Sequence, residues 1–305
     1  MATTKESLLS PTRMNHVVGN VSRKLAARFK NVRKYASEMR RQTKRLRVKV
    51  PKDVKTVQEL VEGGIDPLFA VYAAVQNLTS VFSEGVSQFQ ELEEFYDIVA
   101  AAEDEYMPSG PPMSPLTGSY FTTWVFFDVR FGYDKETIGT CMIDVSGALD
   151  MDPFMVEAMR HFQASRMGIY EHVGVEDGKI CLRELLTDDE FHCHCPAGYV
   201  GKKGELWYVR LCPPVGSLFD YHVTITTPYI LLEAAKTDWV AYLNRTLLDA
   251  SDQRQGLHDL LKYGPTLRYW PEFVFQAYHH HQTEAIFLKG LPDVKGSRPH
   301  ARKEE

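Results

Sequence analysis

The segment Phe191–Cys195, which reads FHCHC, has the residue types and spacing of a metal-binding strand. Successive side chains of a strand point to opposite faces, so His192 and His194 would share one face and Cys193 and Cys195 the other. Two histidines on one face can supply two ligands to zinc, which needs a third protein ligand. The alternative is that the cysteines face a hydrophobic core while the histidines lie at the surface.

A third ligand could come from the His-rich segment Tyr278–His281, which precedes Glu284. In a helix, His280 and Glu284 would lie one turn apart and could bind one ion together. One alternative hypothesis is therefore a metal-dependent hydrolase that holds Zn²⁺ with His192, His194, His280 and Glu284.

Motifs of the known catalytic types are missing from this chain, which contains no HExxH, CxxC, GxSxG, Walker A or GxGxxG pattern. Asp128, Glu136 and Asp144 have the chemistry of nuclease carboxylates, but no Glu-x-Lys pattern lies near them. The five cysteines form no disulfide framework in a chain of this length, which favours a reducing compartment. We therefore favour a non-enzymatic role without a cofactor.

The chain divides sharply by charge. Residues 1–55 carry sixteen Lys and Arg and three Asp and Glu, whereas residues 56–305 carry 19 basic and 37 acidic side chains. This asymmetry indicates a basic N-terminal segment that contacts an anionic partner. Neither a signal peptide nor a run of eighteen apolar residues is present, so we expect a cytoplasmic protein without a membrane partner.

The basic segment has the periodicity of an amphipathic helix between residues 21 and 47. Apolar side chains recur at steps of three and four residues, beginning with Val21, Leu25 and Phe29, and Pro51 ends the pattern. The opposite face carries the basic side chains, which are the residues that we expect to contact nucleic acid: Arg23, Lys24, Arg28, Lys30, Arg33, Lys34, Arg40, Arg41, Lys44, Arg45 and Arg47.

Several partners fit a helix with one basic face. Lys and Arg along a phosphate backbone release counterions, which favours nucleic acid, alone or within a ribonucleoprotein or DNA complex. An acidic protein also fits, as a neighbouring subunit of an assembly or as the acidic remainder of this chain. An anionic membrane is the weakest choice, because the apolar stripe contains no Trp. The leading hypothesis is a non-enzymatic nucleic-acid-binding or accessory protein, and another alternative is an assembly subunit whose basic arm docks on an acidic protein.

Helical periodicity continues through residues 53–106, and a Pro- and Gly-rich linker follows at 107–118. Residues 119–131 combine strand-forming residue types with helical spacing, and we favour a helix. The region 119–166 predicts a helical hairpin whose second helix starts at Pro153. This hairpin is compatible with a helix-turn-helix, whose second helix offers these donors: Arg160, His161, Gln163 and Arg166. We favour the alternative, an ordinary helical hairpin that packs in a core.

From residue 167 the pattern changes to short alternating strands separated by turns. Glu176-Asp177-Gly178 is typical of a hairpin turn. Five short strands at this spacing predict a small antiparallel β-barrel over about 167–226, within a region that ends at residue 228.

Residues 229–290 return to helical periodicity, with helices expected at 229–248, about 254–263 and 271–288. The tail, residues 291–305, is polar. Together with the basic helical arm of residues 1–52, these regions predict an α+β fold of helical layer, small barrel and C-terminal helices.

Four stretches taken together look like an uncharacterised family of bacterial proteins: SPLTGSYFTTWVFFDVRFG, ETIGTC, GELWYVRLCPP and FQAYHHHQTEAIFLKGLPDV. The resemblance covers roughly residues 107–300. It implies a bacterial cytosolic protein and carries over no activity, cofactor, partner or functional residue.

Overall fold

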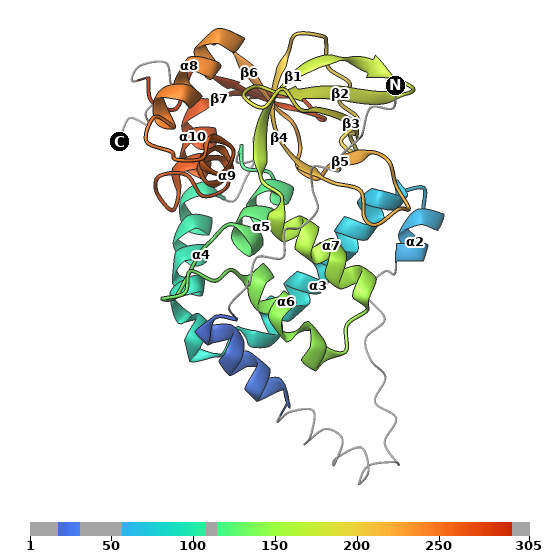
Figure 1. Cartoon of the computed structure of the whole chain (residues 1–305), viewed down its shortest axis with the longest axis vertical. Helices are drawn as coiled ribbons and strands as arrows, with labels where there is room; N and C mark the ends of the chain where they lie inside the picture. The colour runs from blue at the N-terminus through green and yellow to red at the C-terminus, as the bar shows by residue number, and fades with distance from the viewer. Residues whose placement is uncertain (1–17, 31–56, 108–114, 295–305) are drawn as a thin grey trace.

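The structure, a computed structural model, describes residues 18–30, 57–107 and 115–294. Helices form one end of the molecule, and a small β-barrel with additional strands and helices forms the other (Figure 1). The α+β class with a small barrel and C-terminal helices, which the sequence predicts, is therefore confirmed.

The helical layer contains a helical segment at residues 20–30 and the helices between residues 57 and 164. Their bounds are α2 (Val57–Glu62), α3 (Pro67–Val86), the 3₁₀ turn η1 (Gln90–Leu92), α4 (Glu93–Tyr106), α5 (Gly118–Phe127), α6 (Ile138–Leu149) and α7 (Pro153–Ala164). Four of these helices begin after a side chain that accepts a backbone N–H: Asp66, Thr117, Thr137 and Asp152.

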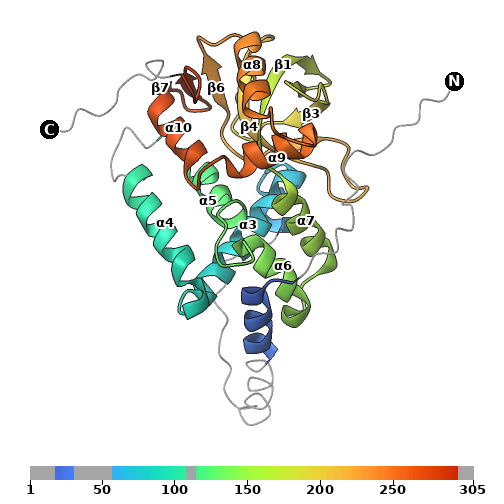
Figure 2. The ribbon, with the colours of Figure 1, turned by 60° about the vertical axis from the view of Figure 1, so that its left-hand side comes forward.

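The two helical predictions for residues 119–166 are confirmed. The aromatic segment forms α5, which buries Trp124 and Phe127. The next two helices form the hairpin, where Asp150 adopts a left-handed φ of 58° and Pro153 begins α7. Both hairpin helices pack on α3, as the turned view in Figure 2 shows.

The barrel closes through five strands: β1 (Met167–Glu176), β2 (Lys179–Glu184), β3 (Glu190–His194), β4 (Leu206–Cys212) and β5 (His222–Thr224). They follow the order β1-β2-β3-β5-β4, and β4 pairs back to β1. The expected hairpin turn is confirmed, with φ of 48° at Asp177 and 74° at Gly178. One pairing departs from the antiparallel prediction. β3 and β5 run parallel, because β4 lies between them in the chain.

Three further strands, β6 (Tyr229–Leu232), β7 (Tyr278–His281) and β8 (Ile286–Lys289), extend the sheet beyond β4. The helices among them are α8 (Lys236–Thr246), α9 (Gln253–Tyr263) and α10 (Tyr269–Ala277). The helices predicted at 229–248 and 271–288 are therefore wrong in part, because the first segment begins as β6 and the second ends in a hairpin. β6 and β8 form a parallel ladder, which local periodicity does not reveal.

Two hydrophobic clusters hold the fold together. The larger one joins the helical layer to the outer face of the barrel, and the smaller one fills the barrel interior. The interior cluster consists of Tyr170, Ile180, Leu182, Cys193, Cys195, Trp207, Val209, Leu211, Ile230, Ala285 and Phe287. Among the helices of the described residues, none combines the length and the apolar character that crossing a bilayer requires.

Candidate functional site

The helical segment at residues 20–30 packs its apolar stripe on the helical layer, at the end of the molecule away from the barrel (Figures 1 and 2). Val21 and Leu25 are buried in the larger cluster, and Phe29 lies against Phe82 with ring centroids 6.0 Å apart. The apolar face predicted for the basic helix is thus confirmed for the part that the structure describes.

The N-terminus of this segment is bound by carboxylates from the loop before α6. Glu136 accepts hydrogen bonds from the Val21 backbone N at 2.9 Å, the Ser22 backbone N at 2.8 Å and Ser22 Oγ at 2.5 Å. Asp134 accepts one from the Asn20 backbone N at 2.7 Å. Because free N–H groups give a helix N-terminus a partial positive charge, these carboxylates stabilise the docked segment.

Four of the predicted nucleic-acid contacts lie in the described part of this segment, and all four are exposed: Arg23, Lys24, Arg28 and Lys30. Arg28 Nη2 pairs with Glu91 at 2.9 Å and lies over the Phe89 ring at 4.6 Å. The Glu91 pKa is lowered by a hydrogen bond with its own backbone N–H and, more weakly, by Arg28 and Lys24.

Within residues 18–30, 57–107 and 115–294, Arg23, Lys24 and Lys30 form no ion pair, and Arg23 Nε donates to the Gly19 carbonyl at 3.3 Å. The remaining predicted contacts lie outside the described residues: Arg33, Lys34, Arg40, Arg41, Lys44, Arg45 and Arg47.

The helix-turn-helix donors are mostly engaged within the molecule. Gln163 donates to the Phe127 carbonyl at 3.0 Å, and Arg166 pairs with Glu184 at 2.8 Å. His161 lies 3.7 Å from Glu157 on the same helix, and Arg160 is exposed. The hairpin therefore presents few free donors to a DNA groove, and its geometry favours a packing role.

The structure does not bring the four predicted zinc ligands together. His192 and His194 point outward from β3 while Cys193 and Cys195 face the barrel interior, as the alternative reading predicted. The expected helix around His280 is absent, because that residue lies in β7, where it stacks on Phe287 at 4.3 Å. Glu284 lines a surface depression of about 410 Å³ that it shares with Tyr199 and Glu205.

Two of the three carboxylates considered for a nuclease have separate structural roles. Glu136 binds the N-terminal segment, whereas Asp128 lies in a buried group with Arg210 of β4 and Lys262 of α9. Asp128 Oδ1 accepts from Lys262 Nζ at 2.7 Å, and Arg210 binds Asp128 Oδ2. Lys262 also donates to the Ser165 carbonyl at 2.8 Å, so the group ties α5, α7, β4 and α9 together.

Burial lowers the pKa of Lys262 in this group and the pKa of His258, which lies nearby on the same helix. The pKa of Lys262 is lowered to about 8, because desolvation and repulsion from Arg210 outweigh the attraction of Asp128. The pKa of His258 is lowered to about 3 by burial and then by Lys262, Arg166 and Arg210. The sequence reading missed Lys262, whose signal was a charged residue beside the apolar stripe of α9, formed by Leu257, Leu260 and Leu261.

The sequence reading also missed a group on the outer face of the barrel. Glu176, Cys181 and His192 place one potential metal-ligating atom each within 4.8 Å of one another. The sequence prediction groups His192 with His194, His280 and Glu284 instead, because the register of β1, β2 and β3 is not visible from spacing along the chain.

No protein-family model, no curated protein and no solved structure matches this chain. The bacterial family resemblance seen in four stretches thus gains no support from these comparisons.

Proposed function

We propose that the protein binds nucleic acid, or a complex that contains it, through the basic face of its N-terminal helical segment. The observation that carries the proposal is the orientation of residues 20–30. Val21 and Leu25 are buried in the helical layer, whereas Lys24 and Lys30 are exposed. A basic helix anchored in this way presents its charges to a partner without first having to fold.

The charge around this face supports a polyanionic partner. Only Arg28, of the four basic side chains in the described segment, pairs with a carboxylate of the described residues. The sequence continues with seven more basic residues of the predicted face. If six side chains neutralise phosphates on duplex DNA, the logarithm of affinity falls with the logarithm of salt concentration with a slope of roughly −5.

The test measures fluorescence anisotropy of labelled duplex DNA, single-stranded DNA and RNA with the full-length protein over a range of salt concentrations. The double variant Lys24→Glu/Lys30→Glu should bind more weakly and reduce the salt slope by about two if both side chains contact phosphates. The matched control is Lys202→Glu/Lys203→Glu, which makes the same charge change at exposed positions on the barrel. Binding without salt dependence, or equal losses in both variants, would refute the proposal.

A second candidate is an assembly subunit whose basic segment docks on an acidic protein. The observation that favours it is the Arg28–Glu91 pair, in which this segment already binds a carboxylate. Size measurements after nuclease treatment separate the two functions. An assembly that survives nuclease and dissociates at high salt supports a protein partner, whereas loss of the large species on nuclease treatment supports nucleic acid.

A further inference from the structure

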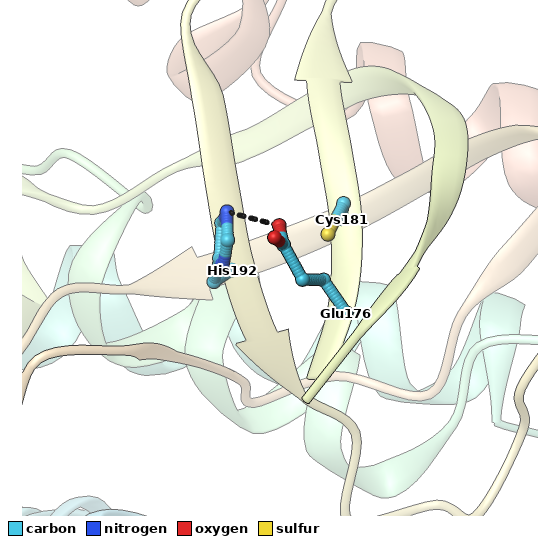
Figure 3. A group of neighbouring side chains, drawn as sticks. All are labelled: Glu176, Cys181 and His192. Atoms are coloured by element: carbon cyan, nitrogen blue, oxygen red, sulfur yellow. Dashed lines mark ion pairs between the residues drawn. The ribbon is translucent and has the colours of Figure 1, made fainter. Parts of the chain in front are cut away.

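Three neighbouring strands of the barrel bring a carboxylate, a thiol and an imidazole to one place on its outer face. Cys181 of β2 lies directly opposite His192 of β3 in the strand register. Glu176 reaches the same place from the end of β1, as Figure 3 shows. Its Oε2 lies 3.7 Å from His192 Nε2, and the ligating atoms of all three residues lie within 4.8 Å of one another.

Cys181 differs from the other cysteines in its orientation. Its neighbours Ile180 and Leu182 belong to the barrel interior, so the alternation of the strand turns Cys181 outward. The remaining four cysteines lie in the two hydrophobic clusters: Cys141, Cys193, Cys195 and Cys212. Cys181 is itself buried, at 8% exposure, but it lies beside the exposed side chains of Glu176 and His192. It is therefore the thiol placed to meet an ion that these two side chains hold.

We propose that Glu176, Cys181 and His192 form a binding site for a divalent transition metal, with Zn²⁺ as the preferred ion. Thiolate, imidazole and carboxylate are the ligands that zinc takes in proteins, and three of them leave one position of a tetrahedron open. Two ligands of a tetrahedral zinc lie about 3.5 Å apart, close to the observed separation of Glu176 and His192. All three ligating atoms lie within 4.8 Å of one another, so a bound ion would require the exposed side chains of Glu176 and His192 to move slightly closer to the Cys181 sulfur.

The ligand set argues against the hard cations. Ca²⁺ and Mg²⁺ prefer oxygen ligands, and a site with one oxygen, one nitrogen and one sulfur does not satisfy them. The bound ion would cross-link β1, β2 and β3 and would keep one position for water or for a ligand from a partner. The site rests on different residues from the basic segment, so its failure would leave the nucleic-acid proposal untouched.

Cobalt titration of the full-length, untagged, reduced protein tests the site, because Co²⁺ replaces Zn²⁺ and its bond to a thiolate gives a sulfur-to-metal charge-transfer absorption. The wild type should show this absorption, and added Zn²⁺ should remove it. Cys181→Ser should abolish it, while Glu176→Gln and His192→Gln should each weaken binding by about tenfold or more. His194→Gln is the matched control, since it removes an imidazole from the same face of the same strand and should bind as the wild type does.

The exposed histidines of β7 are the main competing site, and a variant that replaces His279, His280 and His281 with Gln tests them. Loss of cobalt binding in that variant, with retention in Cys181→Ser, would overturn the proposal. So would a wild type that shows no charge-transfer absorption. Because Cys181→Ser could disturb the fold, circular dichroism accompanies each titration, and the exposed His192→Gln variant provides an independent reading.

Discussion

Lys262 Nζ donates a 2.7 Å hydrogen bond to Asp128 Oδ1, and both side chains are buried. Arg210 binds the other oxygen of the same carboxylate, so one anion is shared by two cations. Burying a charge is costly unless a partner compensates it. Loss of the shared anion should therefore harm the fold more than loss of one of the two cations.

The Asp128→Asn variant is expected to lower the free energy of unfolding by about 3–5 kcal/mol, since it leaves two buried cations without compensation. Lys262→Met should cost less, because the remaining Arg210–Asp128 pair is balanced. Urea denaturation at pH 7 measures both variants. Equal losses, or a larger loss for Lys262→Met, would show that the carboxylate is not the balancing charge.

The lowered pKa of Lys262 predicts a change in stability at alkaline pH. Between pH 8 and 10.5 the unfolded chain keeps a proton that the folded protein has lost, so this residue raises the free energy of unfolding as pH rises through that window. Buried thiols oppose this trend, because burial raises the pKa of both Cys141 and Cys212 to about 12. The measurement is therefore the difference in unfolding free energy between the wild type and Lys262→Met, which should shift in favour of the wild type from pH 8 to 10.5. A flat difference would place the folded pKa of Lys262 near its ordinary value.

His258 predicts a loss of stability in acid. Its folded pKa of about 3 lies below the ordinary value of 6.5, so between these values the unfolded state binds the proton that the folded state excludes. The free energy of unfolding should fall as pH drops through this window. After burial, the positive charges that oppose protonation of His258 are those of Lys262 on the same helix, Arg166 after α7 and Arg210 of β4.

The His258→Gln variant, which cannot be protonated, should lose part of this acid dependence and gain on the wild type between pH 6 and pH 4, a window that lies inside the range set by the two pKa values. Thermal unfolding across this range measures the difference. His222 also has a lowered pKa, about 4, so some dependence should remain. If His258→Gln follows the wild-type curve throughout, the pKa of His258 in the folded state is close to its ordinary value.

The local elements of this fold were predictable because their signals lie within a few residues. Pro153 at the start of α7 and Asp177-Gly178 in the first hairpin mark their own positions through fixed backbone preferences. The strands β6 and β8 are not evident from the sequence, since the ladder between them joins two segments far apart in the chain. A short apolar segment such as Ile286–Lys289 fits a buried helix as well as a buried strand.

The candidate sites also combine features that the sequence reveals with contacts that it does not reveal. The apolar stripe that docks residues 20–30 follows from periodicity, whereas the binding of that segment by Glu136 depends on a contact across more than a hundred residues. The outward orientation of His192 follows from strand alternation. Its neighbours Glu176 and Cys181 become visible only once the register of three strands is known, and β1 contains an irregularity between His172 and Gly174 that shifts this register.

Gly19 provides the sharpest test of how the basic segment is held. A Cβ atom at this position would overlap the carboxyl group of Glu136, which is buried and binds the backbone of Val21 and Ser22. Gly19→Ala should therefore displace that carboxylate and lower the free energy of unfolding by about 1–3 kcal/mol. Hydrogen exchange of residues 20–30 should become faster at the same time, because the segment loses the acceptors of its first N–H groups.

The matched control for this prediction is Gly147→Ala, which also adds one methyl group. A Cβ at Gly147 in α6 meets no neighbouring atom, and alanine in a helix is more stable than glycine by about 0.5–1 kcal/mol. Gly147→Ala should thus leave exchange in residues 20–30 unchanged and raise stability slightly. If Gly19→Ala behaves like this control, Glu136 does not hold the segment, and the basic face is not presented from a fixed position.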